Sequence, residues 1–126
     1  MGVITYYIIN PNEAKNNAKK AAEFLNSYDG AVIIVGTTSH WGSADTSIEL
    51  SLSRSETIAD ILVELGVDRD RIQCYGGGYS DKDLVINDLD SNGKLIESLA
   101  VANRSVHLLS ANHEFAKKYI DGTFKP

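Results

Sequence analysis

The order of hydrophobic and polar residues along the chain predicts strands that alternate with helices. Residues 3–9 are mostly β-branched or aromatic, which is typical of a strand. In residues 14–25, small and apolar side chains recur at helical spacing, and Pro11 before them suits a first helical turn. Residues 31–35 are apolar throughout, which indicates a strand that is covered on both faces.

The second half of the chain continues this alternation. Apolar residues at helical spacing from Ile58 to Leu65 predict a second helix, and Gly66 is suited to end it. Residues 71–75 and 106–109 predict two more strands, with a short helix over residues 95–100 between them. Because helices connect the strands, we expect a layered α/β sandwich in which some strands are parallel.

A chain of 126 residues is long enough for one domain and too short for two ordinary ones. We assign residues 1–110 to the domain and residues 111–126 to a C-terminal tail, where Phe115, Tyr119 and Ile120 indicate a short surface helix. The longest apolar run, residues 31–35, is far shorter than a membrane span of roughly twenty residues. No segment has the pattern of a secretory signal, so we expect neither a signal nor a span.

Charge and cysteine content exclude several classes of protein. Twelve Lys and Arg residues against seventeen Asp and Glu residues give a formal net charge of −5. This balance argues against binding to nucleic acid or to anionic membranes, because phosphate binding needs clustered positive charge. Cys74 is the single cysteine of the sequence, which excludes an intrachain disulfide and a zinc site of several cysteines. The histidines lack metal-ligand spacing, so we predict no metal and no cofactor.

The loop at residues 36–43 is the first candidate for a binding site. It follows the most apolar strand, and ligands of open α/β sheets lie beyond the carboxyl ends of the strands. Arg54 is the nearest cationic side chain on the following helix, and a guanidinium group can hold a carboxylate through two hydrogen bonds. The alternative is that Arg54 is a solvated helix charge whose stem covers apolar surface.

Ser39 and His40, with Asp45 close in sequence, raise the alternative of a hydrolase. A nucleophile and its base must converge from a rigid framework, and adjacent loop residues rarely point at one another. The sequence also lacks the G-x-S-x-G motif of α/β-hydrolases. We therefore predict that the protein is not an enzyme and keep the hydrolase as the weakest alternative.

Two further segments resemble ligand sites in part. Residues 88–93 match the first half of a calcium loop, but Leu99 stands where a bidentate glutamate is needed. The same residues also suit an ordinary turn. The glycines at residues 76–78 follow a strand, as a phosphate-binding loop would. No Lys-Ser/Thr pair follows them, which favours a tight exit from the strand.

Five segments, taken in order, resemble the OmpA-like domain, a peptidoglycan-associating module of bacterial envelopes that is also found in the stator protein MotB. The family pattern has a G-H-T-D loop, N-x-x-L-S-x-x-R-A at a helix start, G-V/I-x-x-x-R-I, G-x-G and N-R-R-V. The corresponding segments are residues 36–39 (GTTS), 47–55 (SIELSLSRS), 66–72 (GVDRDRI), 76–78 (GGG) and 103–106 (NRSV). The resemblance spans residues 4–109. It implies an α/β (α+β) two-layer sandwich of order βαβαβ-(α)-β, with a mixed sheet and helices on one face.

The resemblance also implies non-covalent binding of the stem peptide of peptidoglycan. In the family, the loop Asp pairs with the ammonium group of diaminopimelate, and the helix Arg pairs with its carboxylate. Arg54 matches that helix arginine, and Arg104 matches an arginine of the last strand that supports the ligand. By position, the predicted ligand-binding residues are Thr38, Ser39, Ser47, Arg54, Asn103 and Arg104.

This chain departs from the family pattern at the residues that carry charge. Ser39 stands where the family has its Asp, and Ser47 stands where it has Asn. Without the carboxylate, the ammonium group loses its countercharge, so we expect diaminopimelate to bind about tenfold to a hundredfold more weakly. Asp45 is a candidate replacement. Ser105 occupies the place of the second arginine of the last motif, which removes a further positive charge.

We therefore predict a non-enzymatic module that binds peptidoglycan peptide and anchors part of the cell envelope. The alternative is a degenerate OmpA-like domain with a structural or protein-interaction role and no affinity for peptidoglycan. A cell-wall ligand implies a location in the envelope, in the periplasm or at the outer membrane. The sequence predicts no nucleic-acid partner and leaves a homodimer open.

Overall fold

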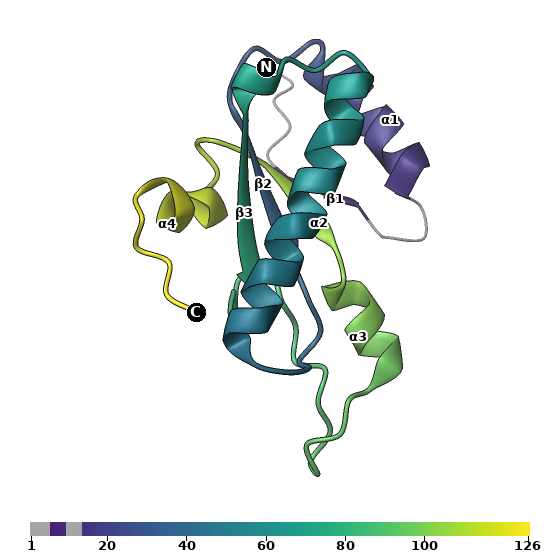
Figure 1. Cartoon of the computed structure of the whole chain (residues 1–126), viewed down its shortest axis with the longest axis vertical. Coiled ribbons are helices and arrows are strands. Elements are labelled where there is room, and N and C mark those ends of the chain that lie inside the picture. Colours follow the sequence, from purple (N-terminus) through teal and green to yellow (C-terminus); the bar gives the residue numbers. More distant parts are fainter. Residues whose placement is uncertain (1–5, 10–13) are drawn as a thin grey trace.

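The computed structural model describes residues 6–9 and 14–126, and its elements follow the predicted order. Residues 3–5 of the predicted first strand, and Pro11, lie outside the described residues. Figure 1 shows the arrangement of the elements. They are β1 (Tyr6–Ile9), α1 (Ala14–Leu25), β2 (Val32–Thr37), α2 (Ala44–Glu64), η2 (Arg69–Arg71), β3 (Ile72–Gly78), α3 (Glu97–Asn103), β4 (Val106–Ser110), η3 (Glu114–Ala116) and α4 (Lys117–Ile120).

The described strands form one mixed sheet in the order β1-β4-β2-β3. β2 and β3 are parallel, whereas β4 lies between β1 and β2 and is antiparallel to both. All of β2 is buried, which confirms the prediction of a strand covered on both faces. Parallel strands end at the same edge of a sheet, so β2 and β3 finish together. β4 starts at that edge, where Val106 pairs with Gly36.

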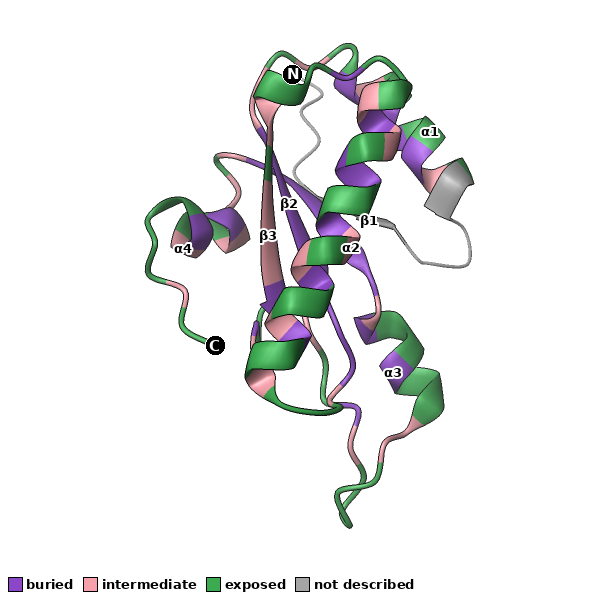
Figure 2. Cartoon of the chain, viewed as in Figure 1, coloured by how far each residue is buried: buried purple, intermediate pink, exposed green. Residues whose placement is uncertain are grey.

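The two long helices cover one face of the sheet and form the main hydrophobic core with it. This core contains Ala21 and Leu25 of α1, Ile58 and Leu62 of α2, and Ile34 of β2. Figure 2 shows the buried residues along β2 and on one side of α2. Tertiary burial of these apolar stripes stabilises both helices, and it confirms the predicted two-layer α/β sandwich.

The C-terminal residues pack on the opposite face of the sheet. A second hydrophobic cluster joins Ile33 and Val35 of β2 and Leu109 of β4 to Ala116 and Tyr119 of the short elements η3 and α4. The helical turn expected in the tail is therefore present, and its aromatic side chain is buried instead of lying on the surface.

α2 touches the sheet backbone to backbone near the edge where β2 and β3 end. A Cβ atom added at Gly36 of β2 would clash with the carbonyl oxygen of Ser51, and one added at Gly76 of β3 would clash with that of Ile48. Only glycine allows a helix backbone to come this close to a strand. The glycines at residues 76–78 are thus explained by helix packing as well as by the exit from the strand.

Replacing Gly36 with alanine is expected to lower the free energy of unfolding by about 1–3 kcal/mol, because the added methyl group forces α2 away from β2. Denaturant unfolding of the purified chain measures this loss. Gly122→Ala is the control, since a Cβ atom there meets nothing within 4 Å and only its positive φ of 72° opposes the change. If Gly36→Ala costs less than Gly122→Ala, the close contact of α2 with β2 does not matter for stability.

Candidate functional site

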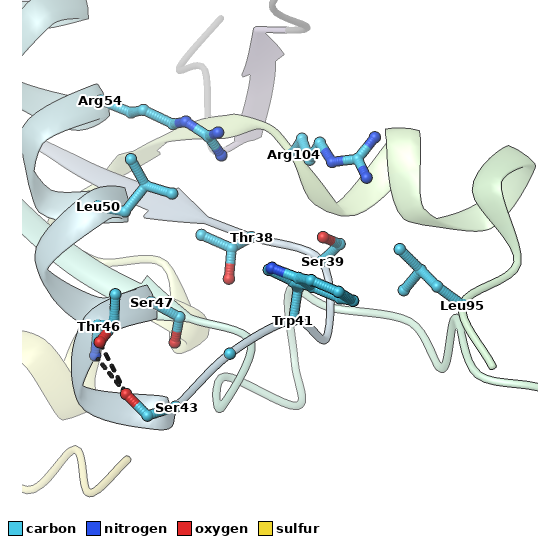
Figure 3. Close-up of a pocket in the computed structure, with 11 residues that line it drawn as sticks. Thr38, Ser39, Trp41, Ser43, Thr46, Ser47, Leu50, Arg54, Leu95 and Arg104 are labelled. Carbon is cyan, nitrogen blue, oxygen red and sulfur yellow. Dashed lines mark hydrogen bonds between the residues drawn. The ribbon is translucent and has the colours of Figure 1, made fainter. Parts of the chain in front are cut away.

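A cleft of about 430 Å³ opens where β2 ends and α2 begins. Its walls come from the loop after β2, the first three turns of α2, and residues on either side of α3 (Figure 3). Hydroxyl groups, two arginines and a few apolar side chains line it. They are Thr38, Ser39, Ser43, Thr46, Ser47, Arg54, Arg104, Trp41, Leu50 and Leu95, together with Gly42.

The structure brings five of the six predicted site residues to this cleft, although they lie up to 66 positions apart in the sequence. Thr38 and Ser39 come from the loop, Ser47 and Arg54 from α2, and Arg104 from the end of α3. The pairing of β2 with β4 creates this proximity, because the start of β4 lies beside the end of β2. Their role in ligand binding stays a prediction.

Arg54 is half-buried, and its guanidinium group reaches the loop instead of bulk solvent. Its Nη1 atom lies 3.5 Å from the carbonyl oxygen of Thr37. Burial lowers the pKa of Arg54, and the positive charge of Arg104 lowers it further. Within residues 6–9 and 14–126, no carboxylate forms an ion pair with Arg54. A cation without a countercharge in a partly buried cleft is suited to bind an anion.

Arg104 also lines the cleft, but it already has a partner. Its Nη1 atom lies 2.5 Å from Oε1 of Glu97, and its Nη2 atom lies 3.3 Å from Oε2. Glu97 raises the pKa of Arg104 through these hydrogen bonds. The ion pair is largely exposed, so it orients the guanidinium group more than it stabilises the fold.

The structure does not support Asp45 as a replacement for the family's carboxylate. Asp45 lies in the first turn of α2, where its side chain is exposed, and it does not line the cleft. Ser43 caps this helix, and its hydroxyl accepts a hydrogen bond from the backbone N–H of Thr46 at 3.1 Å. An acidic side chain in the first turn of a helix interacts favourably with the helix dipole, which accounts for Asp45 without a ligand.

Thr38 carries a buried polar group with no partner. The residue is 5% exposed, and its Oγ1 atom forms no hydrogen bond with the described part of the chain. Leaving a buried hydroxyl unpaired costs about 1–3 kcal/mol, so such groups are rare unless a ligand or water completes them. Thr38 also lines the cleft, so its hydroxyl is a candidate donor to a ligand oxygen there.

Asn103, the sixth predicted residue, does not line the cleft but braces the loop behind it. Its amide nitrogen donates to Oδ2 of the buried Asp88 at 2.9 Å and to the carbonyl oxygen of Ile86 at 2.8 Å. His40 binds the same carboxylate, with Nδ1 lying 2.6 Å from Oδ1. Burial raises the pKa of Asp88, but the hydrogen bonds from Asn103 and His40 outweigh it and lower the pKa overall.

The contacts of His40 argue against the hydrolase alternative. His40 is held by Asp88 and stacks on Tyr79, with ring centroids 4.9 Å apart. Ser39 and His40 share no hydrogen bond in the described structure, and Asp45 lies on α2 away from both. A nucleophile activated by a base is therefore not formed by these residues.

The calcium-loop alternative fails for a similar reason. Asp88, its first ligand, is buried and already accepts hydrogen bonds from His40 and Asn103. Asp90 accepts hydrogen bonds from the backbone N–H groups of Asn92 and Lys94 at 2.8 and 2.9 Å. Residues 88–93 thus form the ordinary turn that was the other interpretation of this motif.

Sequence reasoning missed the apolar part of the cleft. Trp41 is 78% exposed and lies at the mouth of the cleft, next to Ser39 (Figure 3). Leu50 of α2 and Leu95, which precedes α3, complete this rim. A single tryptophan in a polar loop forms no periodic pattern in the sequence. Its exposure, which indicates a binding surface, is visible only in the structure.

A family model for the OmpA family matches residues 6–93 of the chain. A search of curated proteins gives no significant match. The part of the chain that the structure describes contains no helix long and apolar enough to cross a membrane.

Several solved structures are similar to this one. The peptidoglycan-associated lipoprotein from Burkholderia pseudomallei has a TM-score of 0.63 and 17% identity, over 85% of this chain and 90% of that chain. The C-terminal domain of Helicobacter pylori MotB has a TM-score of 0.61 and 14% identity, over 94% and 89%. The OmpA-like domain of FopA1 from Francisella tularensis has a TM-score of 0.60 and 22% identity, over 82% and 69%. At these identities the likeness shows the fold.

Proposed function

Because this chain belongs to the OmpA family, as the match over residues 6–93 shows, we propose that its cleft binds the stem peptide of peptidoglycan non-covalently. The chain then acts as an anchoring module of the cell envelope, located where the cell wall is accessible. One of the similar solved structures is that of a peptidoglycan-associated lipoprotein, which supports the proposal.

The observation that carries the proposal is Arg54. Its guanidinium group is half-buried, lines the cleft, and has no carboxylate partner within the described residues. The stem peptide of peptidoglycan offers free carboxylates, and a charge-assisted hydrogen bond contributes about 1.5–3 kcal/mol. The unpaired hydroxyl of Thr38 and the hydroxyl of Ser39 lie beside the same space and can donate to a carboxylate oxygen.

The proposed activity is binding without catalysis. Ser39 lines the cleft, but the neighbouring imidazole of His40 is engaged by Asp88. No residue in the described cleft therefore has the base that a nucleophilic hydroxyl requires. The cleft is shaped and charged to hold a ligand.

A second candidate is a structural or protein-interaction domain that has no affinity for peptidoglycan. It is favoured by Ser39, which leaves the described cleft without a carboxylate to hold an ammonium group. Both candidates share the fold and differ only in whether the cleft takes the cell-wall peptide.

We expect the purified chain to sediment with isolated peptidoglycan sacculi, and Arg54→Ala to weaken this binding about tenfold to a hundredfold, because one charge-assisted contact is lost. Quantifying bound and free protein over a range of sacculus concentrations gives the affinity. Arg54→Lys keeps the charge but loses the two-pronged geometry, so it should bind with intermediate strength.

The matched control is Arg69→Ala, which removes the same charge. Arg69 lies in η2, before the start of β3, whereas the cleft lies near the end of β2 and β3. Arg69 is exposed, pairs with Asp60 at 2.6 Å, and does not line the cleft. If Arg54→Ala and Arg69→Ala sediment equally well, Arg54 does not hold the ligand. A wild-type chain that fails to sediment at all leaves the structural or protein-interaction role.

A further inference from the structure

We propose that the cleft recognises its ligand through carboxylate groups alone, so that a dicarboxylate without ammonium groups binds at least as tightly as diaminopimelate. The inference names the ligand class of the proposed peptidoglycan site and therefore rests on that function. Its basis is that, among the residues that the structure describes, two arginines and no acidic residue line the cleft.

The charged side chains that line the described cleft are all positive. Arg54 and Arg104 both line it, and Figure 3 shows Arg54 extending from α2 toward the end of α3 that carries Arg104. Glu97 forms an ion pair with Arg104 and so compensates its charge, but Glu97 does not line the cleft. The cleft therefore has one uncompensated positive charge, at Arg54, and an ammonium group placed there would be repelled by it.

The hydroxyl groups of the cleft favour the same ligand. The Ser47 hydroxyl donates to the carbonyl oxygen of Ala44 at 2.7 Å, and the Ser43 hydroxyl donates to Oγ1 of Thr46 at 2.8 Å, so both protons are already used. Thr38 has an unused hydroxyl proton, because its Oγ1 atom has no partner in the described structure. A free hydroxyl proton beside an arginine completes the coordination of a carboxylate oxygen.

Among the described lining residues, hydroxyl oxygens can accept a hydrogen bond from an ammonium group, and Trp41 can favour one through the face of its indole ring. At an exposed site such an interaction is worth about two- to fivefold in affinity. Trp41 is 78% exposed, so this lower range applies. A charge-assisted hydrogen bond from Arg54 is worth roughly tenfold to a hundredfold. We therefore assign Trp41, with Leu50 and Leu95, to contact with the aliphatic part of the ligand.

Calorimetric titration of the chain with pimelate and with diaminopimelate tests the inference, because the two share a seven-carbon dicarboxylate and differ in the ammonium groups. We expect pimelate to bind as tightly as diaminopimelate or more tightly, and Arg54→Ala to lose at least tenfold in affinity for pimelate. Diaminopimelate binding at least tenfold more tightly than pimelate would overturn the inference, as would a lack of binding by both.

Two variants locate the effect within the cleft. Ser39→Asp introduces the missing carboxylate and is expected to shift the ratio of the two affinities at least tenfold toward diaminopimelate. Trp41→Leu, at an exposed position, should weaken both ligands by the same factor. A selective loss of diaminopimelate binding in Trp41→Leu would show instead that the indole ring holds an ammonium group.

Sedimentation with sacculi separates this inference from the proposed function. A chain that sediments with sacculi but prefers diaminopimelate retains the function and loses the inference. A chain that binds pimelate through Arg54 but does not sediment retains a carboxylate site and loses the peptidoglycan function.

Discussion

Replacing Asp81 with alanine is expected to lower the free energy of unfolding by about 3–5 kcal/mol, which is a large part of the stability of a domain of this size. Asp81 is 1% exposed and lies in the loop after β3. Its Oδ2 atom accepts a hydrogen bond from the hydroxyl of Tyr119 at 2.5 Å, and its Oδ1 atom accepts one from Nζ of Lys118 at 2.7 Å.

The size of this effect follows from what the substitution leaves behind. Tyr119 is 6% exposed, and without Asp81 its hydroxyl would be buried with no partner. Burial raises the pKa of Tyr119 above its ordinary value, and the adjacent carboxylate of Asp81 raises it further, because both oppose the phenolate. Of its two carboxylate partners Lys118 would keep Asp83 alone, and the backbone N–H groups of Asp83 and Leu84 would lose an acceptor.

Denaturant unfolding at pH 7 measures the loss, with Asp60→Ala as the matched control. Asp60 forms an ion pair of the same kind with Arg69 at 2.6 Å, but both side chains are more than half exposed, so its removal should cost at most about 1 kcal/mol. A double-mutant cycle with Tyr119→Phe gives the coupling to the tail. If Asp81→Ala is no more destabilising than Asp60→Ala, the contacts of Asp81 with Lys118 and Tyr119 do not hold α4 on the sheet.

The elements of this fold could be predicted because each has a local pattern. β2 is an apolar run between glycines, and α1 and α2 have apolar residues at helical spacing. All three are present, although α2 begins at Ala44, well before the apolar pattern that starts at Ile58. The contact between α2 and the sheet could not be predicted in the same way. It depends on Gly36 and Gly76, which are far from Ser51 and Ile48 in sequence and become neighbours only after folding.

The candidate site was predictable only in its charged and hydroxyl part. Arg54 and Ser39 were indicated by their place in a known family pattern, and the structure brings them to one cleft. Trp41 and Leu95 belong to no motif, and a loop that begins after β3 brings Leu95 to the cleft. The role of Asn103 was missed because a buried amide and a ligand-binding amide have the same appearance in a sequence.

The burial of polar residues in the segment after β3 could not be predicted from the sequence either. Residues 79–96 form a polar stretch, and polar stretches are usually exposed loops. Here Asp81 and Asp88 are buried, because Lys118, Tyr119, His40 and Asn103 satisfy their carboxylates. These partners come from three separate segments of the chain, so no local pattern distinguishes the buried carboxylates from the exposed ones.

His107 is a buried polar residue of β4, and it is expected to make the protein sensitive to mild acid. Its Nε2 atom lies 2.9 Å from Oγ1 of Thr37, whose carbonyl oxygen is near Arg54. Burial lowers the pKa of His107 from 6.5 to about 4, and the negative charge of Asp81 opposes this only in part. The folded protein therefore holds His107 neutral at a pH where the unfolded chain is already protonated.

This difference fixes the sign and the range of the effect. Between pH 6.5 and about 4 the unfolded chain binds one proton more than the folded chain, so the free energy of unfolding decreases as the pH falls. At about 1.4 kcal/mol per pH unit, the total loss is about 3 kcal/mol.

Denaturant unfolding at intervals from pH 7.5 to pH 4 measures this loss of stability. His107→Gln can still donate to Thr37 but does not titrate. Its free energy of unfolding should therefore fall by about 3 kcal/mol less than that of the wild type over this pH range. Parallel curves for the wild type and His107→Gln would mean that His107 is protonated equally easily in both states, so that its buried position beside Thr37 tolerates a positive charge.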